Sequence, residues 1–556
     1  MYDRDERKLY IGKSGEEKVY IYPKMANRHG MIAGATGTGK TVTLKVLAES
    51  FADAGVPVFL ADVKGDLAGM CRAGVASDDM NARIERFSLE SDGFDFHSYP
   101  VTFWDVYGKK GLPVRTTITE MGPLLLGRIL GLNDTQTDIL KVVFRIADDE
   151  GLLLIDSKDL RAMLAHVSQN AKEYSINYGN ISAQSMGVIT RAVMALETEG
   201  ANQFFGEPAL DIRDWLVRDC DGRGQISILA CQTLINYPTM YSTFLLWMLS
   251  ELFEILPEAG DLDKPKMVFF FDEAHMLFDS ANRALLEKIE QVVKLIRSKG
   301  VGVFFITQSP KDIPNGVLAQ LGTKIQHALH AYTPAEMKTI KSAADSFRSN
   351  PEFDTVQAVQ ELGIGEALVS VLDEEGVPTI VKRTKILPPQ SQMGAISEDI
   401  RDNEITGCLL FNKYIEEIDR DSAYEFLMRK QLEDEEAKQA AIEAAQREKE
   451  EAAARKLAEK EEAAATKAAE KQAKNEAAER IKAEMAAKKA KEKEEAARKA
   501  TITRATKSVA STAAGTIGRE MGNAVGKSVG GSFGKKLGGN VGASLGRGLI
   551  GTLFKK

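Results

Sequence analysis

The residues with the most specific chemistry in the chain form the octapeptide GATGTGKT, which runs from Gly34 to Thr41. It follows the apolar run 31–33 and precedes a segment with helical periodicity, so it matches the phosphate-loop pattern G-x-x-x-x-G-K-[ST] in a strand–loop–helix context. Its glycines let the backbone fold closely around a phosphate with N–H groups pointing inward, and the positive end of the next helix strengthens the same anion site. The residues that we expect to contact a nucleotide are Gly34, Ala35, Thr36, Gly37, Thr38, Gly39, Lys40 and Thr41.

Two side chains at the end of this loop have separate roles in such a site. Lys40 is expected to reach the β- and γ-phosphates, because a lysine at this position of the motif carries the charge that balances them. The Thr41 hydroxyl is expected to hold Mg²⁺. The loop therefore predicts a site for a nucleoside triphosphate together with Mg²⁺.

A second motif supplies carboxylates. The stretch KMVFFFDEAH, residues 266–275, carries five apolar residues that end in Asp272 and Glu273. This pattern is typical of a buried parallel strand that delivers acidic side chains to its C-terminal edge. We expect Asp272 to belong to the outer shell of Mg²⁺ and Glu273 to polarise the water that attacks the γ-phosphate.

Further candidates for the same site have weaker signals. Gln308 ends the next apolar run, VGVFFITQSP, where an amide could sense the γ-phosphate or orient water. Asp62 ends an earlier run, residues 56–61, and the sequence leaves open whether it joins the site or only holds a loop. Phosphoryl transfer also needs positive charge beyond one lysine, and the candidates for it are Arg297 and Arg28.

These residues have to be positioned by a sheet whose strands end at one edge. Short apolar runs that alternate with helical segments predict an α/β fold with a mainly parallel sheet. Helical periodicity from residue 120 to about 200 predicts an inserted helical subdomain, with VRTTI, residues 114–118, as a strand before it. The predicted divisions are 1–118 and 201–390 for the two parts of the core, 119–200 for the helical insertion, 391–430 for a C-terminal helical segment, 431–500 for a charged helix and 501–556 for a basic tail.

The composition excludes several classes of protein. A hydrophobic fraction of 44% in 556 residues is enough for a large core, and no apolar run approaches the ~18 residues of a membrane-spanning helix. The four cysteines are widely spaced without a C-x-x-C pair, which indicates reduced thiols rather than a zinc site. The N-terminal stretch is charged and has no apolar signal segment, so we expect a cytoplasmic protein. A net charge of −8 argues against indiscriminate coating of nucleic acid but allows a local basic channel.

The C-terminal part differs in composition from the rest. Residues 431–500 are rich in Ala, Glu and Lys with opposite charges three and four apart, which predicts an exposed helical spacer rather than a tight leucine-rich coiled coil. In residues 501–556, glycine recurs at every fourth position from Gly518 to Gly546, and nine Lys or Arg accompany one acidic residue. Three interpretations stay open for this tail: self-association or docking of a protein partner, an anionic membrane surface, and a segment without structure of its own.

Five motifs taken together resemble the HerA/FtsK superfamily of hexameric ATPases, with particular similarity to the YjgR-type HerA-like proteins of bacteria. They are HGMIAGATGTGKT, LADVKGD, VFFFDEAH, FFITQSP and LGIGEALVS, in this order within about residues 8–430. The resemblance implies a RecA-like core, hydrolysis of ATP with Mg²⁺ and assembly into a ring, with Arg297 acting in cis and Arg28 in trans. HerA proteins carry a β-barrel before the ATPase, whereas the phosphate loop here begins at residue 34, so we expect no barrel.

Two main functions stay open at this point, beside the weaker alternative of a simple ATP-binding switch with negligible turnover. The first is an ATP-driven motor that forms a homo-hexamer or another ring and translocates on DNA, because heterologous contacts let one subunit complete the site of its neighbour. The second is an ATP-dependent scaffold or remodelling protein that acts on protein partners or a membrane surface through the C-terminal helix and tail. Only the nucleotide chemistry is common to both.

Overall fold

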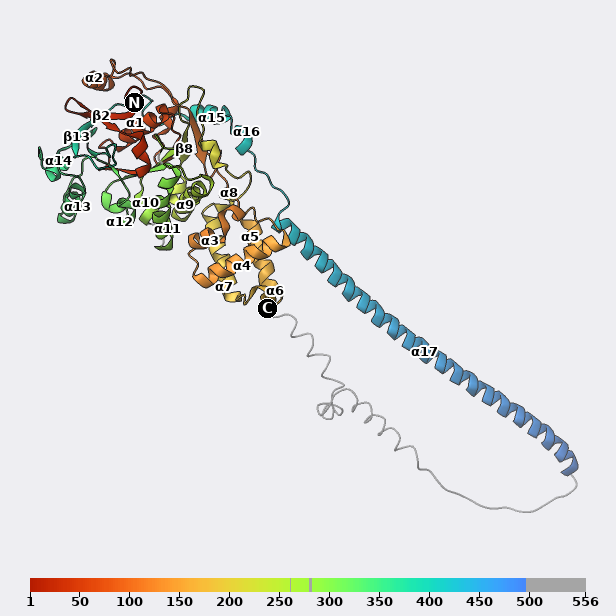
Figure 1. The fold of residues 1–556 in the computed structure, drawn as a ribbon. Helices are drawn as coiled ribbons and strands as arrows, with labels where there is room; N and C mark the ends of the chain where they lie inside the picture. Colours follow the sequence, from red (N-terminus) through yellow and green to blue (C-terminus); the bar gives the residue numbers. More distant parts are fainter. Residues whose placement is uncertain (261, 280–282, 497–556) are drawn as a thin grey trace. The chain divides into compact units, whose positions relative to one another are not determined.

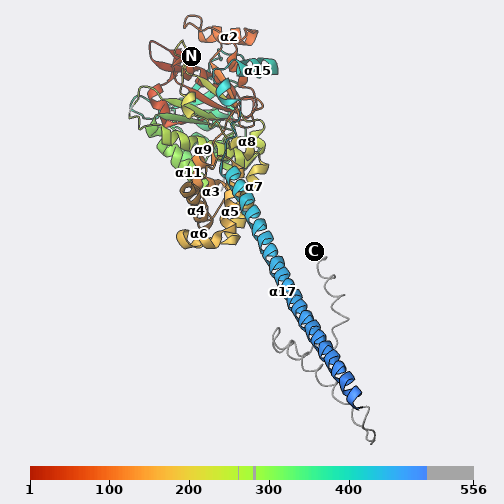
Figure 2. The ribbon, with the colours of Figure 1, turned by 90° about the vertical axis from the view of Figure 1, so that its right-hand side faces the viewer.

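A single large sheet dominates the computed structural model of the chain, which describes residues 1–260, 262–279 and 283–496. Two compact units divide the chain, residues 1–440 and residues 441–556, and the sheet lies in the first (Figures 1 and 2). It has 13 strands with helices on both faces. The predicted α/β class with a mainly parallel sheet is confirmed. The predicted Gly-rich tail lies outside the described residues.

The parallel part of the sheet positions the predicted motifs. In spatial order its strands are β11 (Thr323–Gln326), β4 (Gly30–Ala33), β10 (Val301–Thr307), β9 (Met267–Phe271), β5 (Val58–Asp62), β8 (Ile226–Ala230), β6 (Val101–Asp105) and β7 (Leu112–Pro113). Ala33 at the end of β4 is the register partner of both Thr307 and Gln326, and Phe271 is the partner of Ala61. The segments that follow β4, β10, β9 and β5 therefore leave the sheet side by side at one edge.

The remaining strands extend the sheet beyond β11 in antiparallel pairs. They are β12 (Glu366–Ser370), β13 (Lys382–Ile386), β2 (Lys8–Ser14), β3 (Glu17–Ile21) and β1 (Tyr2–Asp3). Strand β12 pairs with β11, β13 with β12, and β2 with β13, so the first and last strands of the core are neighbours. This pairing brings the segment after β13 back towards the helix that follows β4.

Helices cover both faces, which explains why the central strands are apolar without alternation. On one face lie α1 (Lys40–Asp53) and α2 (Asp78–Phe87), and on the other α9 (Pro238–Ile255), α10 (His275–Asp279) and α11 (Arg283–Ile296). Within β9, Phe270 packs toward α1, where its ring centroid lies 6.2 Å from that of Phe51. Phe269 and Phe271 belong to the opposite core.

A group of helices occupies residues 118–204, beside the sheet in Figure 1. They are α3 (Ile118–Ile129), α4 (Asp134–Glu150), α5 (Ser157–Gln169), α6 (Ala171–Tyr178), α7 (Ala183–Thr198) and α8 (Ala201–Phe204). The prediction of a strand at residues 114–118 is wrong. Thr117 and Glu120 form a capping box that starts α3 at Ile118, and this local signal outweighs the β-branched residues that favoured a strand.

Six further helices lie in the last part of the described chain, some of them between the strands β11, β12 and β13. They are α12 (Asn315–Leu318), α13 (Pro334–Asp345), α14 (Thr355–Glu361), α15 (Glu398–Thr406), α16 (Phe411–Tyr414) and α17 (Ala423–Ala496). The buried Asp159 of α5 accepts hydrogen bonds from the Ser422 hydroxyl and the Tyr424 N–H, which fixes the start of α17. Residues 428–486 of α17 are exposed. Among the described residues, no helix combines the length and apolar character that crossing a membrane requires. All four cysteines are free thiols.

Candidate functional site

The phosphate loop follows Ala33 directly, at the end of β4. Gly34, Gly37 and Gly39 have φ angles of 155°, 81° and 109°, a region that glycine adopts without the penalty of a side chain. A Cβ on Gly34 would lie 2.5 Å from the Cβ of His327, so no larger residue fits there. The conformation of the loop therefore requires the glycines that the motif carries, and helix α1 begins immediately after them.

Lys40 lies folded over this loop. Its side chain is largely buried, and Nζ donates to the carbonyl oxygens of Gly34, at 2.6 Å, and Ala35, at 3.0 Å. Burial lowers the pKa of Lys40, and the nearby Glu273 opposes that shift. Phosphate oxygens would offer the ammonium group stronger, charge-assisted partners than two neutral carbonyls.

His327 supports the loop from beneath. It follows β11, is completely buried, and places Nε2 2.8 Å from Oγ1 of Thr43 on α1. Its backbone N–H donates to the carbonyl of Ala33 at 2.7 Å, so one residue joins β11, β4 and α1. Burial lowers the pKa of His327 to about 4, which keeps the ring neutral at pH 7. The sequence analysis missed this residue, because β11 has the sequence TKIQ and lacks the continuous apolar run that marked the other strand ends.

Asp272 and Asp62 are neighbours because Phe271 and Ala61, the residues before them, are register partners. Both carboxyl groups are buried. Burial, together with the charge of Glu273, raises the pKa of Asp272 to about 6. A divalent cation beside Asp272 would favour the ionised carboxylate, and hard oxygen ligands suit Mg²⁺.

Asp62 has the contacts of a residue that holds a loop. Its carboxylate accepts hydrogen bonds from the backbone N–H groups of Gly65, at 2.7 Å, and Leu67, at 3.3 Å. Burial and the charge of Asp66 raise the pKa of Asp62 to about 7. These bonds fix the turn after β5, which carries Lys64 toward the end of β9.

Glu273 is the centre of the polar contacts at this edge. Its Oε1 lies 2.7 Å from Nζ of Lys64, and its Oε2 accepts from the Gln308 side-chain amide at 3.4 Å and lies 3.4 Å from Nδ1 of His275. Burial alone would raise the pKa of Glu273, but the bonds from Lys64 and Gln308 outweigh it and the pKa is lowered. The residue has φ of 48°, an unusual value for a side chain other than glycine. Glu273 is therefore a buried, ionised base held in a constrained position.

Lys64 and His275 are further site residues that the sequence analysis did not single out. Lys64 belongs to the LADVKGD motif, and its signal was a lysine two residues after an acidic strand end. His275 follows Glu273 by two residues and begins α10.

The two arginine candidates lie at the other edge of the sheet. Arg28 precedes β4 and donates to the carbonyl of Gly376 at 3.4 Å. Arg297 precedes β10, and its charge adds to the effect of burial in lowering the pKa of His29, the residue before β4, to about 4. The seven residues of β10 separate Arg297 from Gln308 by roughly 20 Å of extended chain. The structure therefore does not bring Arg297 to the phosphate loop of its own chain, as a cis role would require. The trans role of Arg28 stays a prediction.

The remaining predicted residues fit a nucleotide with Mg²⁺. Thr36 and Gly37 are exposed at the tip of the loop, and Thr38 braces it by donating its hydroxyl hydrogen to the carbonyl of Ala35 at 2.7 Å. Thr41 is the second residue of α1, close to the positive end of that helix. Backbone N–H groups, one ammonium group, one hydroxyl and one carboxylate are the set that Mg²⁺-bound phosphates need.

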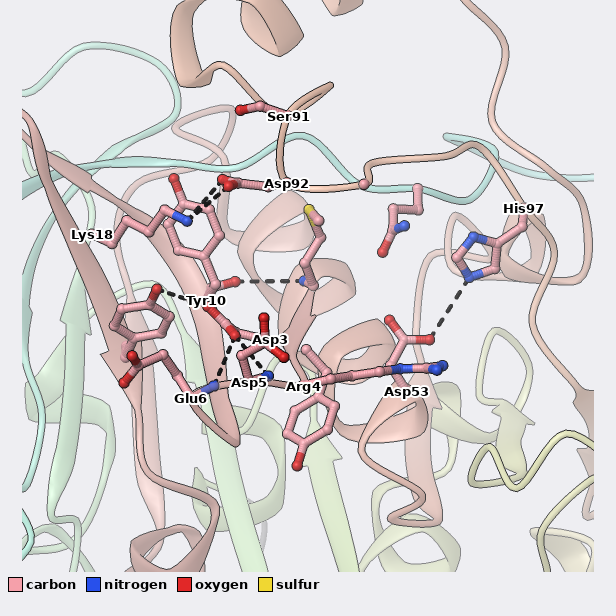
Figure 3. Close-up of a pocket in the computed structure, with 15 residues that line it drawn as sticks. Asp3, Arg4, Asp5, Glu6, Tyr10, Lys18, Asp53, Ser91, Asp92 and His97 are labelled. Carbon is pink, nitrogen blue, oxygen red and sulfur yellow. Dashed lines mark hydrogen bonds and ion pairs between the residues drawn. The ribbon is translucent and has the colours of Figure 1, made fainter.

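A second polar cavity lies at the opposite end of α1 (Figure 3). Several of its charged residues are paired with one another. It has a volume of about 650 Å³ and lies beside the hairpin of β2 and β3. Lys18 pairs with Asp92 at 2.9 Å, and His97 lies 3.7 Å from Asp53. We assign these contacts to holding the segment after α2, which carries Asp92 and His97, against the hairpin and against the end of α1.

The loop, the paired acids at the end of β9 and the amide at the end of β10 define a P-loop ATPase with a RecA-like core. The chain belongs to the family described as Helicase HerA-like C-terminal, which it matches over residues 7–556. The resemblance to the HerA/FtsK superfamily is thereby confirmed.

Individual relatives are distant. The DNA double-strand break repair helicase HerA of Sulfolobus acidocaldarius is 21% identical over 395 residues, which cover 67% of this chain and 68% of that protein. The probable helicase MJECL08 of Methanocaldococcus jannaschii is 32% identical over 132 residues, 23% of each chain. Among solved structures, the bacterial conjugative coupling protein TrwB has a TM-score of 0.44 at 15% identity, covering 68% of this chain and 88% of that one. VirB4 of Thermoanaerobacter pseudethanolicus has a TM-score of 0.43 at 16% identity, covering 68% and 96%.

The buried His327 predicts an acid-sensitive fold. Its pKa of about 4 in the folded chain lies below the ordinary value of 6.5, so the unfolded chain binds a proton first as the pH falls. Stability is therefore lost between pH 6.5 and 4, by up to about 3 kcal/mol from this group. We expect the free energy of unfolding of His327→Gln, measured with urea, to depend less on pH over that range than that of the wild type. His330→Gln, at an exposed position three residues later, is the control. Equal pH dependence in all three proteins would contradict this account.

Proposed function

We propose that the chain is an ATP-driven motor that hydrolyses ATP to ADP and phosphate and acts on DNA as a translocase or helicase. The observation that carries the proposal is the convergence of four chain segments at one sheet edge. The phosphate loop after β4, the acids after β9, the amide after β10 and Lys64 after β5 lie together.

The side chains divide the work of phosphoryl transfer between them. Thr41 and Asp272 would hold Mg²⁺, which supplies positive charge to the phosphate oxygens. Lys40 neutralises charge at the terminal phosphates, and its burial strengthens that interaction. Glu273 accepts the proton of the attacking water, and its contacts with Lys64 and Gln308 keep it ionised and oriented.

DNA as the substrate rests on the family. The chain belongs to a family of HerA-like helicases, and two relatives are described as helicases, one of them in the repair of DNA double-strand breaks. Such a motor encloses its substrate, so we propose a ring of identical subunits, with a hexamer as the expected stoichiometry. In a ring, Arg28 of one subunit would reach the nucleotide site of its neighbour, since within its own chain Arg28 lies at the opposite end of β4 from the phosphate loop.

A second candidate function uses the C-terminal part. Helix α17 exposes residues 428–486 to solvent, and the nucleotide site described above uses none of them. An ATP-dependent scaffold or remodelling protein would present such a helix to protein partners or a membrane surface. Removal of residues 441–556, which form a separate compact unit, should leave the basal ATPase unchanged under both functions. Loss of partner capture or localisation on this truncation, in a protein whose ATPase does not respond to duplex DNA, would favour the second function.

Replacement of Glu273 by Gln tests the catalytic base. The amide keeps the size of the side chain but cannot accept the proton, so we expect kcat to fall about 100-fold or more with little change in the Kd for ATP. Glu90→Gln, at an exposed position, is the matched control. An unchanged steady-state rate of phosphate release in Glu273→Gln would remove Glu273 from the mechanism.

Replacement of Lys64 by Met tests its role as a positioning residue. Without the ion pair of 2.7 Å, Glu273 is no longer held in its constrained conformation, so we expect kcat to fall about tenfold while the Kd for ATP stays within about threefold. Lys109→Met, at an exposed position, should behave like the wild type. A parallel loss of ATP affinity would instead assign Lys64 to phosphate binding.

Duplex DNA should stimulate the ATPase of the assembled protein at low salt. Contacts to DNA phosphates release counterions, so stimulation should weaken steeply between about 50 and 200 mM salt. The measurement combines the oligomeric mass with the ATPase rate with and without duplex DNA. A stable ring whose ATPase ignores DNA at low salt would contradict the proposed substrate.

A further inference from the structure

A cavity of about 580 Å³ opens beside the phosphate loop, at the start of α1 and away from the catalytic acids. Four separate segments form it: the first turn of α1, the region of α2, the turn before β12 and the stretch that follows β13. The residues that the argument uses are Gly39, Val42, Arg83, Ile364, Pro388 and Met393. None of these side chains has a role in the hydrolysis described above.

The cavity is continuous with the loop that binds phosphate. The N–H of Gly365 donates to the carbonyl of Thr38 at 3.1 Å, and a Cβ on Gly39 would lie 3.2 Å from the nitrogen of Gly365. The turn before β12 thus touches the end of the phosphate loop. A ligand with its phosphates on the loop would extend directly into the cavity.

Apolar side chains at the mouth of the cavity are exposed in the part of the chain that the structure describes. Ile364 is 77% exposed, Val75 72% and Met393 46%, while Pro388 behind them is buried. Exposed apolar groups clustered around a cavity are a mark of a binding site. In this cavity, the exposed apolar side chains would pack against the faces of an aromatic ring in a bound ligand.

Arg83 supplies a cation at the same place. Its Nη1 lies 2.9 Å from the position that a Cβ on Gly365 would take, so the guanidinium lies against the turn before β12. Nε donates to Asp79 at 3.1 Å, and the side chain is 23% exposed. A planar guanidinium fixed in this way can stack on the face of a nucleobase.

Three polar side chains around the cavity already have partners. Ser77 caps α2, Asp79 holds Arg83, and the Ser391 hydroxyl donates to Glu49 at 2.5 Å. The Glu49 carboxylate also accepts the backbone N–H of Gln390 at 2.8 Å, which ties the stretch after β13 to α1. These bonds hold the walls of the cavity, which offer apolar side chains and a guanidinium face together with one further polar side chain, Gln392.

We propose that this cavity holds the nucleoside end of the nucleoside triphosphate, with a purine base between the Arg83 guanidinium and the apolar side chains of Ile364 and Met393. The inference rests on the proposed function, since it assumes that the phosphates lie on residues 34–41. Contacts with the faces of a purine do not distinguish adenine from guanine, which differ at their edges. We therefore expect ATP and GTP to bind with similar affinity. We also expect inorganic tripolyphosphate, which has no base, to bind much more weakly than either.

The experiment compares the Mg²⁺-dependent binding of ATP, GTP and tripolyphosphate to the full-length chain and its variants. Arg83→Ala and Ile364→Ser should each weaken ATP binding about tenfold and leave tripolyphosphate binding unchanged, because one stacking partner of the base is lost. Arg86→Ala, at an exposed position on the same helix, should match the wild type in both. Tripolyphosphate binding reports that each variant keeps a folded phosphate loop.

Different results overturn different claims. If ATP binds to Arg83→Ala and Ile364→Ser as tightly as to the wild type, the base lies elsewhere and this inference fails while the ATPase stands. Wild-type selectivity for ATP over GTP of more than about 100-fold would also overturn it, since edge recognition would then dominate. If the wild type binds neither ATP nor tripolyphosphate, the proposed function fails and this inference with it.

Discussion

The parallel register of β4, β10, β9 and β5 is the constraint on which the site depends. Because Ala33 lies opposite Thr307, and Phe271 opposite Ala61, four chain turns leave the sheet at one edge. A parallel strand carries its following residues to the same edge as its neighbours, so a loop, a pair of adjacent acids, an amide and a lysine meet although they come from four separate segments of the sequence. A shift of one strand by one residue would turn these side chains to the other face.

That arrangement concentrates buried acids, and the site contains the groups that stabilise them. Asp62 and Asp272 have pKa values raised to about 7 and about 6, mainly by burial, so their ionised forms are disfavoured without a cation. Asp62 accepts backbone N–H groups, and Glu273 has Lys64. Mg²⁺ beside Asp272 would supply the remaining positive charge, so binding of the metal and of the nucleotide should reinforce each other.

Much of this site could be predicted because buried parallel strands are continuous apolar runs and the first polar residue marks their end. Asp62, Asp272 and Gln308 all follow such runs, and the structure puts them at one edge. The same logic applied to Arg297 indicates the opposite edge, since that residue precedes its strand. Lys64 was missed because its contact with Glu273 spans 209 residues, a distance that no local pattern reports. Local signals can also compete, as at Thr117, where a helix cap overrides strand propensity.

The central claim is that one nucleotide occupies the edge where these segments meet. It is tested most directly by an experimental structure of the protein with a non-hydrolysable ATP analogue and Mg²⁺. The account predicts the metal between the Thr41 hydroxyl and the Asp272 carboxylate, with the γ-phosphate facing Glu273 and Gln308. A nucleotide whose γ-phosphate lies away from Glu273, or whose Mg²⁺ has no contact with Asp272 directly or through water, would contradict it.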